Sequence, residues 1–373
     1  MGNNLKTYLE KNIPFALFRA PGKSIRLVAQ RSPLSFDVDF SKTGFHFAPF
    51  SKREKVPHIV IRNDVDVLLG NKNTSDSLSN KIISVFQNNF ISISKKETRP
   101  LENNSKEISV SLHTYKKHIN TYLEFFKNND TQKAIYSRIK KINLSEEFDL
   151  IAFFEKIEKA YDRAMVYLVH LPGIGLWAGA SPETLLKYKN GTAETVALAG
   201  TQKILEAQNV EDLEWGKKEI EEHQMVVNYI TDKIKRNHLK IINDLKPYTS
   251  RAGAMAHLKQ RFEFKINKTQ LPKFINELHP TPAVCGLPKA KALDLIYQTE
   301  PYDRQYYAGY LGMVEENDTV DFYVNLRCMK IYNNTAALFV GGGITANSIP
   351  EKEWEETELK SKTLLNVLDL ITV

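Results

Sequence analysis

The sequence has few cysteines and no long apolar run, and these two shortages exclude several classes of protein. Only Cys285 and Cys328 occur among its 373 residues, and their spacing matches no zinc motif, so a disulfide framework and a cysteine-based zinc site are excluded. No run of about eighteen apolar residues is present that could form a membrane-spanning helix. Residues 1–12, MGNNLKTYLEKN, lack the apolar core of a signal peptide. We therefore expect a cytoplasmic protein that does not enter a membrane.

The sequence also lacks a concentrated basic stretch. Lys and Arg total 51 against 44 Asp and Glu, and the resulting net charge of +7 suits nucleic acid, anionic lipid or a small polycarboxylate equally well. The basic residues are scattered, with no stripe interleaved with aromatic residues and no recognisable nucleic-acid module. We therefore expect no nucleic-acid partner.

What the sequence does contain is enough apolar material for a large globular core, with 42% hydrophobic and 10% aromatic residues. Apolar periodicity predicts helices over residues 111–127, 150–161 and 209–236, while residues 305–314 and 319–332 are each predicted to form one strand. Long antiparallel strand runs mixed with helices favour an α+β fold with large antiparallel sheets over a doubly wound parallel sheet.

A glycine-rich stretch near the C-terminal end combines several features that suit anion binding. An apolar strand ends in Gly341, Gly342 and Gly343, which are predicted to form a turn with accessible backbone N–H groups. Ser348 is the predicted N-cap of the helix that follows. The alternative is an ordinary β-to-α turn followed by a solvated helix with surface ion pairs.

Two predicted helices each carry a pair of glutamates three residues apart, Glu219 with Glu222 and Glu353 with Glu356. Mg²⁺ prefers oxygen ligands and takes only one or two carboxylates, while keeping waters and a substrate group. Two such glutamates facing each other would suit it. Glu-rich helix faces are also commonplace on solvated surfaces, so the pattern alone leaves both interpretations open.

Three further residues could carry chemistry. Lys133 begins an alternating strand, and if it points inward, desolvation favours the neutral form that can act as a general base. Glu183 follows a glycine-rich strand and could be a buried acid. Arg327 is predicted in the middle of the apolar strand FYVNLRC, where a guanidinium needs an anionic partner. Each has a plainer alternative: a solvated strand lysine, a turn carboxylate, and an internal Asp or Glu as the arginine's partner.

Taken together, these residues resemble the chorismate-utilising enzyme family, which includes isochorismate, salicylate, anthranilate and aminodeoxychorismate synthases. The resemblance spans residues 133–365 and is carried by GASPETLL, ALAGT, KKEIEEHQMVV, LHPTPAVCGLPKAKAL, EPYDRQYYAG, FYVNLRC and LFVGGGITANSIPEKEWEETELK. It implies the family's fold, with large antiparallel sheets packed together and helices on the outside. Residues 1–110 carry little of it, so we take them as a strand-rich part of the same fold and residues 111–373 as the chorismate-binding catalytic domain.

The resemblance implies a Mg²⁺ cofactor and the residues that hold it. Glu222 and Glu356 match the direct ligands, and Glu219 and Glu353 match the residues that support the metal through water. Lys360 matches a residue that helps to bind the ring carboxylate of chorismate. The clamp on the enolpyruvyl carboxylate and the lining of the ring are matched by Arg327, Tyr307, the Gly341 amide, His257 and Thr201.

The resemblance also implies the roles of the two catalytic residues. Lys133 matches the base that activates water for attack at C2, and Glu183 matches the acid that protonates the departing C4 hydroxyl. Because water is a poor nucleophile and hydroxide a poor leaving group, a base and an acid are both needed. Without the resemblance, His257 would be interpreted as a core or capping histidine.

Among the family members, the sequence is most similar to isochorismate synthase. Water-using members carry lysine at the Lys133 position, where anthranilate synthases typically have glutamine, and Ala199 stands where aminodeoxychorismate synthases place a nucleophilic lysine. Salicylate synthase is the main alternative, anthranilate synthase component I a weaker one, and a catalytically idle anion-binding subunit an alternative of another class. We expect a monomer without a glutamine amidotransferase partner, and either menaquinone or siderophore biosynthesis as the pathway.

Overall fold

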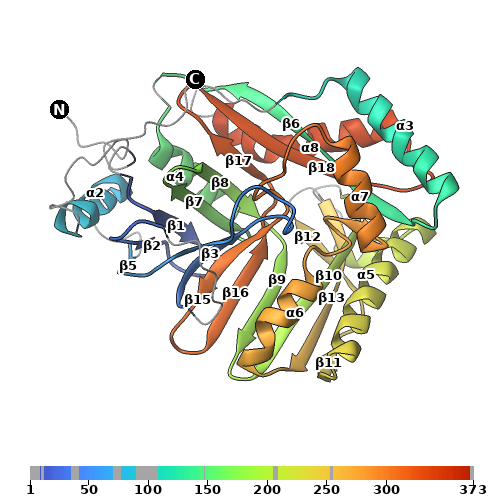
Figure 1. The fold of residues 1–373 in the computed structure, drawn as a ribbon, viewed down its shortest axis with the longest axis horizontal. Coiled ribbons are helices and arrows are strands. Elements are labelled where there is room, and N and C mark those ends of the chain that lie inside the picture. The colour runs from blue at the N-terminus through green and yellow to red at the C-terminus, as the bar shows by residue number, and fades with distance from the viewer. Residues whose placement is uncertain are drawn as a thin grey trace.

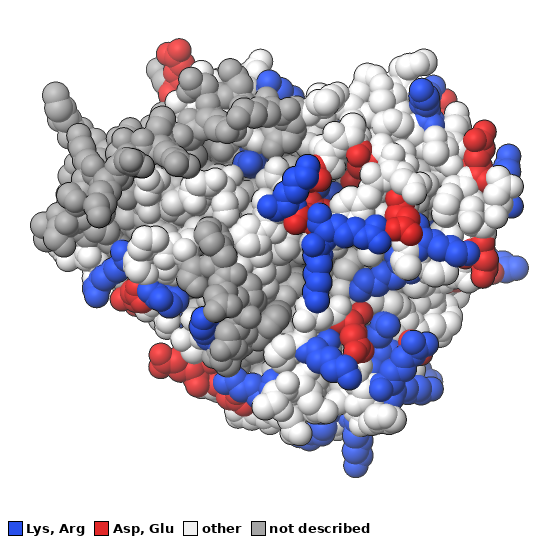
Figure 2. Space-filling view, in the orientation of Figure 1, with Lys and Arg blue, Asp and Glu red and all other residues white. Residues whose placement is uncertain are grey.

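The computed structural model describes residue 9 and residues 12–34, 42–69, 77–89, 108–146, 148–204, 209–252 and 255–369. These residues form two large antiparallel sheets with helices around them, which confirms the predicted α+β class (Figure 1). No helix in this described part is long and apolar enough to cross a membrane. Lys and Arg side chains are spread among acidic ones on the face shown in Figure 2.

We call the first sheet sheet A. Its described strands, in order across the sheet, are β14 (Gly286–Leu287), β6 (Lys133–Asn143), β18 (Thr335–Ile344), β17 (Cys328–Ile331), β8 (Gly175–Ser181), β7 (Met165–Leu171), β1 (Phe15–Arg19), β2 (Arg26–Ala29) and β5 (Val65–Leu68). Apolar side chains are buried on both of its faces. Ala16 and Phe18 belong to one core cluster, while Phe15 and Leu17 belong to another. A sheet covered on both sides explains why β6 is a continuous buried run over its first seven residues and not the predicted alternation.

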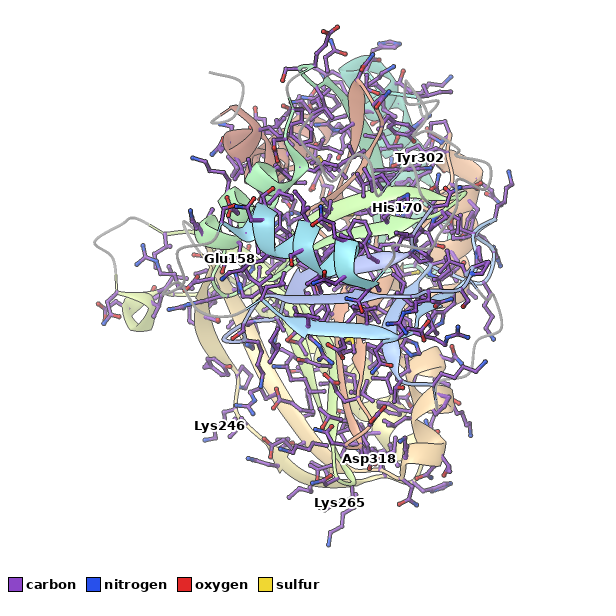
Figure 3. The ribbon with its side chains drawn as sticks, turned by 90° about the vertical axis from the view of Figure 1, so that its left-hand side faces the viewer. Glu158, His170, Lys246, Lys265, Tyr302 and Asp318 are labelled. Atoms are coloured by element: carbon purple, nitrogen blue, oxygen red, sulfur yellow. The ribbon has the colours of Figure 1, made fainter. Side chains whose placement is uncertain are left out.

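The second sheet, sheet B, has the described order β11 (Lys240–Asp244), β13 (Met255–Lys265), β10 (Thr192–Lys203), β9 (Thr184–Lys189), β16 (Thr319–Val324), β15 (Tyr310–Val314), β3 (Gly44–Ala48) and β4 (Ile59–Ile61), with β12 (Tyr248–Ala252) also paired to β13. The side view places Lys265, the last residue of β13, and Asp318, in the turn between β15 and β16, at one end of the molecule and His170 of sheet A toward the other (Figure 3). The larger core cluster lies between the sheets and contains side chains of both.

The described helices are α2 (Leu78–Asn89), α3 (Leu112–Asn128), α4 (Leu150–Ala160), α5 (Lys217–Arg236), α6 (Leu271–Leu278), α7 (Lys289–Thr299) and α8 (Pro350–Asp369), with short 3₁₀ turns at Val210–Asp212 and Lys268–Gln270. Helices α3 and α4 begin where predicted, because Ser111 and Asp149 accept N–H groups of their first turns. The helix predicted from residue 209 begins only at Lys217. Gly216 is the N-cap residue of α5 and has an extended backbone, so the helix cannot continue through it from the preceding 3₁₀ turn.

Two strand predictions near the C-terminal end were wrong. The predicted strand 319–332 is two strands in different sheets, β16 in sheet B and β17 in sheet A, and Arg327 lies in the crossover with a φ of 49°. The predicted strand 305–314 begins only at Tyr310, because Gln305 and Ala308 have left-handed backbones that do not fit a strand.

The glycine turn and the helix cap predicted at residues 341–348 were also wrong. Gly341, Gly342 and Gly343 continue strand β18 and pair with Ser137, Tyr136 and Ile135 of β6, so neighbouring backbone overrides the local turn preference. Helix α8 begins at Pro350, so Ser348 is not its N-cap residue. The Ser348 hydroxyl donates to Glu353 Oε1 instead.

The strands before residue 110 belong to both sheets. In sheet A, β1 pairs with β7, and in sheet B, β3 pairs with β15. The boundary at residue 110 stays a prediction of the sequence.

Candidate active site

The site lies where the last residues of β18 meet the start of β6 and the helices α5 and α8. Three consecutive glycines there leave room for three different groups. A Cβ on Gly343 would lie 2.6 Å from Lys133 Cε, and one on Gly341 would lie 2.8 Å from the Tyr307 hydroxyl. One on Gly342 would lie 3.4 Å from Glu353 Oε2. The glycine run therefore gives the site its space, because any side chain at the first or third position would collide with a functional group.

Lys133, the first residue of β6, points inward and is only 5% exposed. Its Nζ donates a hydrogen bond of 2.5 Å to Glu222 Oε1 on α5. Burial alone would raise the pKa of Glu222, but the charge and the hydrogen bond of Lys133 hold it below its usual value. The strand lysine and the helix carboxylate are thus joined across the site.

A second lysine–glutamate pair lies on α8. Lys360 Nζ donates to Glu356 Oε1 at 2.6 Å and to the Gly341 carbonyl at 2.9 Å. The Lys360 charge lowers the pKa of Glu356, whose side chain remains 45% exposed. Lys360 therefore ties the helix to the glycine run and leaves the Glu356 carboxylate open to solvent.

The other two predicted glutamates differ in their surroundings. Glu353 is buried and accepts a hydrogen bond of 2.7 Å from Ser348 Oγ, and burial raises its pKa. Glu219 Oε2 would lie 2.5 Å from a Cβ on Gly216, so its carboxylate turns back toward the start of its own helix. The structure therefore brings Glu353 close to Glu356, whose charge contributes to its raised pKa, and places Glu219 to one side.

Whether these carboxylates fit a metal depends on how many are needed. Within the described residues, no three His, Cys, Asp or Glu side chains are grouped so as to hold a metal ion. Mg²⁺ requires only one or two carboxylates, and Glu222 and Glu356 reach the site from different helices. The Glu356 charge acts to raise the pKa of Glu222, so the two carboxylates are near enough to repel each other. This donor pair fits a Mg²⁺ ion that keeps waters and a substrate oxygen.

Glu183 lies between β8 and β9 and is buried at 8% exposure. Burial raises its pKa to about 7, against the opposing charges of Lys133, Arg327 and Lys360. Those three charges place Glu183 in the same site as Lys133. A carboxyl group with this pKa is partly protonated near neutral pH, which suits a proton donor.

Arg327 and Tyr307 approach the site from the two irregular segments that the sequence predicted as strands. Desolvation lowers the pKa of Arg327, and its guanidinium makes no hydrogen bond or ion pair within the described residues. The Tyr307 ring stacks on Phe339 with centroids 5.4 Å apart, which aims its hydroxyl at Gly341. A partly buried guanidinium of this kind is a ready site for a carboxylate.

His257 lies on β13, directly opposite Thr201 of β10, beside a register shift between Ala199 and Thr201. Burial and the Arg327 charge lower the pKa of His257 to about 4, so its ring is neutral near pH 7. The side chain of Thr201 lies outside the part that the structure describes. That His257 and Thr201 line the ring of the substrate therefore stays a prediction.

Sequence reasoning missed the residues that hold α8 in place. Arg138, buried in the middle of β6, donates to Thr357 Oγ1 at 2.8 Å and lies 3.8 Å from the centre of the Trp354 ring. It also pairs with Glu358. The signal was available, since Arg138 interrupts the apolar strand AIYSRIK and a buried guanidinium needs partners.

Comparisons with known proteins identify the family of this chain. The family profile described as "Chorismate binding enzyme" matches residues 39–369. The chain belongs to the chorismate-binding enzyme family. It is 29% identical over 244 residues to isochorismate synthase EntC of Escherichia coli K12, covering 64% of this chain and 62% of EntC.

Two further relatives extend the comparison. The vibriobactin-specific isochorismate synthase of Vibrio cholerae is 27% identical over 258 residues, covering 67% of this chain and 65% of that protein. The chain thus spans less than two thirds of the length of EntC and of the Vibrio cholerae enzyme. Its fold is similar to that of MenF, the menaquinone-specific isochorismate synthase of Escherichia coli, with a TM-score of 0.76, 21% identity, and coverage of 95% and 88% of the two chains.

Proposed function

We propose that the protein is an isochorismate synthase, which converts chorismate to isochorismate by adding water at C2 and removing the C4 hydroxyl. The observation that carries the proposal is that one site contains a buried lysine, Lys133, and a buried carboxyl group, Glu183, whose pKa is about 7. The reaction needs a proton acceptor and a proton donor at the same time. Its sequence similarity to isochorismate synthases supports the choice among family activities.

In its neutral form, Lys133 removes a proton from the water that attacks C2, and Glu183 gives its proton to the C4 oxygen, which leaves as water. Because the pKa of Glu183 lies near 7, the acid is partly protonated when the reaction begins. The buried position of Lys133 fixes its amine beside Gly343, so little conformational freedom is lost when substrate binds.

Binding of the dianionic substrate falls to the cationic and hydroxyl groups. Arg327, Tyr307 and the Gly341 amide hold the enolpyruvyl carboxylate, while Lys360 assists at the ring carboxylate and His257 and Thr201 line the ring. Glu222 and Glu356 would hold Mg²⁺, with Glu219 and Glu353 as supporting residues, and the ion would supply positive charge that neutralises and orients the ring carboxylate. Orientation matters because attack and departure occur at different carbons of one ring.

Product identity tests the proposal. Purified protein is incubated with chorismate and Mg²⁺, and products are separated by chromatography while free pyruvate is measured with a coupled dehydrogenase. Isochorismate without pyruvate is expected. Pyruvate with fluorescent salicylate would establish a salicylate synthase, anthranilate formed with added ammonia would establish an anthranilate synthase, and binding without turnover would establish an idle anion-binding subunit.

We further propose that the enzyme acts in the cytoplasm as a monomer, without a glutamine amidotransferase, and that its isochorismate serves menaquinone or siderophore biosynthesis. Elution from a calibrated size-exclusion column at the mass of one 42.7 kDa chain checks that the protein is a monomer. Elution at twice that mass would contradict it.

A further inference from the structure

Asn325 lies in the crossover between β16 and β17 and is completely buried. Both ends of its side-chain amide have a protein partner. Tyr167 Oη donates to Asn325 Oδ1 at 2.6 Å, and Asn325 Nδ2 donates to the Tyr306 carbonyl at 2.8 Å. The hydroxyl of Tyr167, itself fully buried, therefore fixes which way the amide points.

The backbone of Asn325 contacts the same neighbouring segment. Ala308 N donates to the Asn325 carbonyl at 2.8 Å, and Asn325 N donates to the Gly309 carbonyl at 2.8 Å. The Tyr306 carbonyl and the Ala308 N–H flank Tyr307 on either side. Asn325 thus binds the peptide groups immediately before and after Tyr307.

The same crossover places Arg327 two residues beyond Asn325. Arg327 and Ala308 have φ values of 49° and 58°, a left-handed conformation that persists in non-glycine residues only when surrounding contacts hold it. The Arg327 carbonyl accepts from Ala180 N at 3.1 Å, and a Cβ on Gly179 would lie 2.8 Å from that carbonyl oxygen. The crossover is therefore fixed on one side by β8 and on the other by the segment that contains Tyr307.

We propose that Asn325, oriented by Tyr167, is a positioning residue that sets the separation between the Tyr307 hydroxyl and the Arg327 guanidinium, and so shapes the clamp for the substrate carboxylate. This inference rests on the proposed function. Asn325 is buried within the protein and acts only through its two neighbours. Because the clamp binds substrate and takes no part in bond making, its misplacement changes substrate binding more than the chemical step.

The test is Tyr167→Phe, which removes one hydroxyl and leaves the ring in place. Asn325 Oδ1 then loses its donor. The expected result is a rise in KM for chorismate of about three- to tenfold, the upper value corresponding to the full strength of one buried hydrogen bond transmitted to the clamp, with kcat changed less than about twofold. Tyr323→Phe is the matched control, because Tyr323 is also buried and its hydroxyl donates to Asp321, away from the clamp. A KM shift in Tyr167→Phe no larger than in the control overturns the proposal.

A double-mutant cycle separates positioning from a general loss of stability. In an Arg327→Ala background, Tyr167→Phe is expected to raise KM by much less than it does alone, since one half of the clamp is already missing. An undiminished effect in that background would show that Tyr167 acts elsewhere. Asn325→Ala should raise KM further, with urea unfolding as the check that the variant is folded.

A structural readout distinguishes failure of this inference from failure of the proposed function. If the unaltered protein neither binds nor converts chorismate, the isochorismate synthase proposal is wrong. Crystal structures of the protein and of Tyr167→Phe then decide whether Tyr167 and Asn325 position Tyr307 and Arg327. A changed separation between the Arg327 guanidinium and the Tyr307 hydroxyl supports positioning, and an unchanged separation overturns it.

Discussion

Replacing Glu183 with glutamine should abolish turnover and at the same time stabilise the protein at alkaline pH. Burial raises the pKa of Glu183 from about 4.5 to about 7. The folded protein therefore keeps this proton to a higher pH than the unfolded chain does, and folding takes up a proton between the two values. Stability consequently falls as pH rises from about 4.5 to about 7, because the charged form is disfavoured only in the folded state.

The size of this effect follows from the two pKa values. Ionisation of Glu183 costs the folded state about 1 kcal/mol near pH 5 and about 3 kcal/mol near pH 8, so glutamine removes a pH-dependent cost of about 2 kcal/mol. Any effect of the amide itself is the same at both pH values. The difference between the two conditions therefore isolates the ionisation of this one carboxyl group.

Urea unfolding near pH 5 and near pH 8 measures this difference, and chorismate turnover is assayed in parallel. Glu54→Gln is the matched control, because Glu54 is equally buried, also has a pKa raised by burial to about 7, and bonds Tyr297 and the Gln305 N–H away from the candidate catalytic pair. Both variants should gain stability with rising pH relative to the unaltered protein. Only Glu183→Gln should lose turnover.

Two results would refute this reasoning. Equal pH slopes for the unaltered protein and Glu183→Gln would mean that Glu183 ionises at its ordinary pKa and is not desolvated. Full turnover in Glu183→Gln would remove it from the role of proton donor, whatever its pKa.

Three further predictions concern the other side chains of the site. Lys133→Ala should lower kcat by about 10²- to 10⁴-fold, the usual contribution of a general base, while the Kd for chorismate from calorimetry stays nearly constant; an equal loss of affinity would contradict the role. Glu222→Ala should raise the Mg²⁺ concentration needed for half-maximal activity at least about tenfold in a metal titration, whereas Glu221→Ala, whose side chain is 57% exposed on the same helix, should leave it unchanged. Gly343→Ala should eliminate turnover in a folded protein, because the new Cβ would lie 2.6 Å from Lys133 Cε, whereas Gly342→Ala meets only ordinary contacts; comparable activity of the two variants, measured with their unfolding curves, would argue against this steric explanation.

Much of the fold could be predicted because local and long-range preferences agree in it. The Asn190-Gly191 pair, for example, predicts a tight hairpin, and both residues have the left-handed φ values of 48° and 80° that join β9 to β10. The crossover at Arg327 could not be predicted. The residues around it favour a strand, and only contacts from distant elements, including Ala180 N on β8, hold Arg327 in its left-handed conformation.

The candidate site residues were predicted through the resemblance, but their arrangement was not visible in the sequence. Three adjacent glycines predict a turn on local grounds, and their extended pairing with β6 depends on a strand some two hundred residues earlier in the chain. Likewise, spacing places Glu219 and Glu222 near each other on one helix, yet the structure joins Glu222 to Lys133 and turns Glu219 toward Gly216. Contacts between side chains of different helices and strands depend on tertiary structure, and the periodicity of the sequence does not predict them.

The positions of the proposed acid, Glu183, and of Arg327 in the proposed clamp follow from how the chain passes between the two sheets. Glu183 lies where the chain leaves β8 of sheet A for β9 of sheet B, and Arg327 lies where it returns from β16 to β17. Because β8 pairs with β17 and β9 pairs with β16, these two crossovers are neighbours. They are also bonded to each other, since Val324 N donates to the Glu183 carbonyl and Ala180 N to the Arg327 carbonyl. Two residues on irregular backbone are thereby held by backbone hydrogen bonds to neighbouring segments, which is the condition for the proposed proton donor and the proposed anion clamp to act on one small ring.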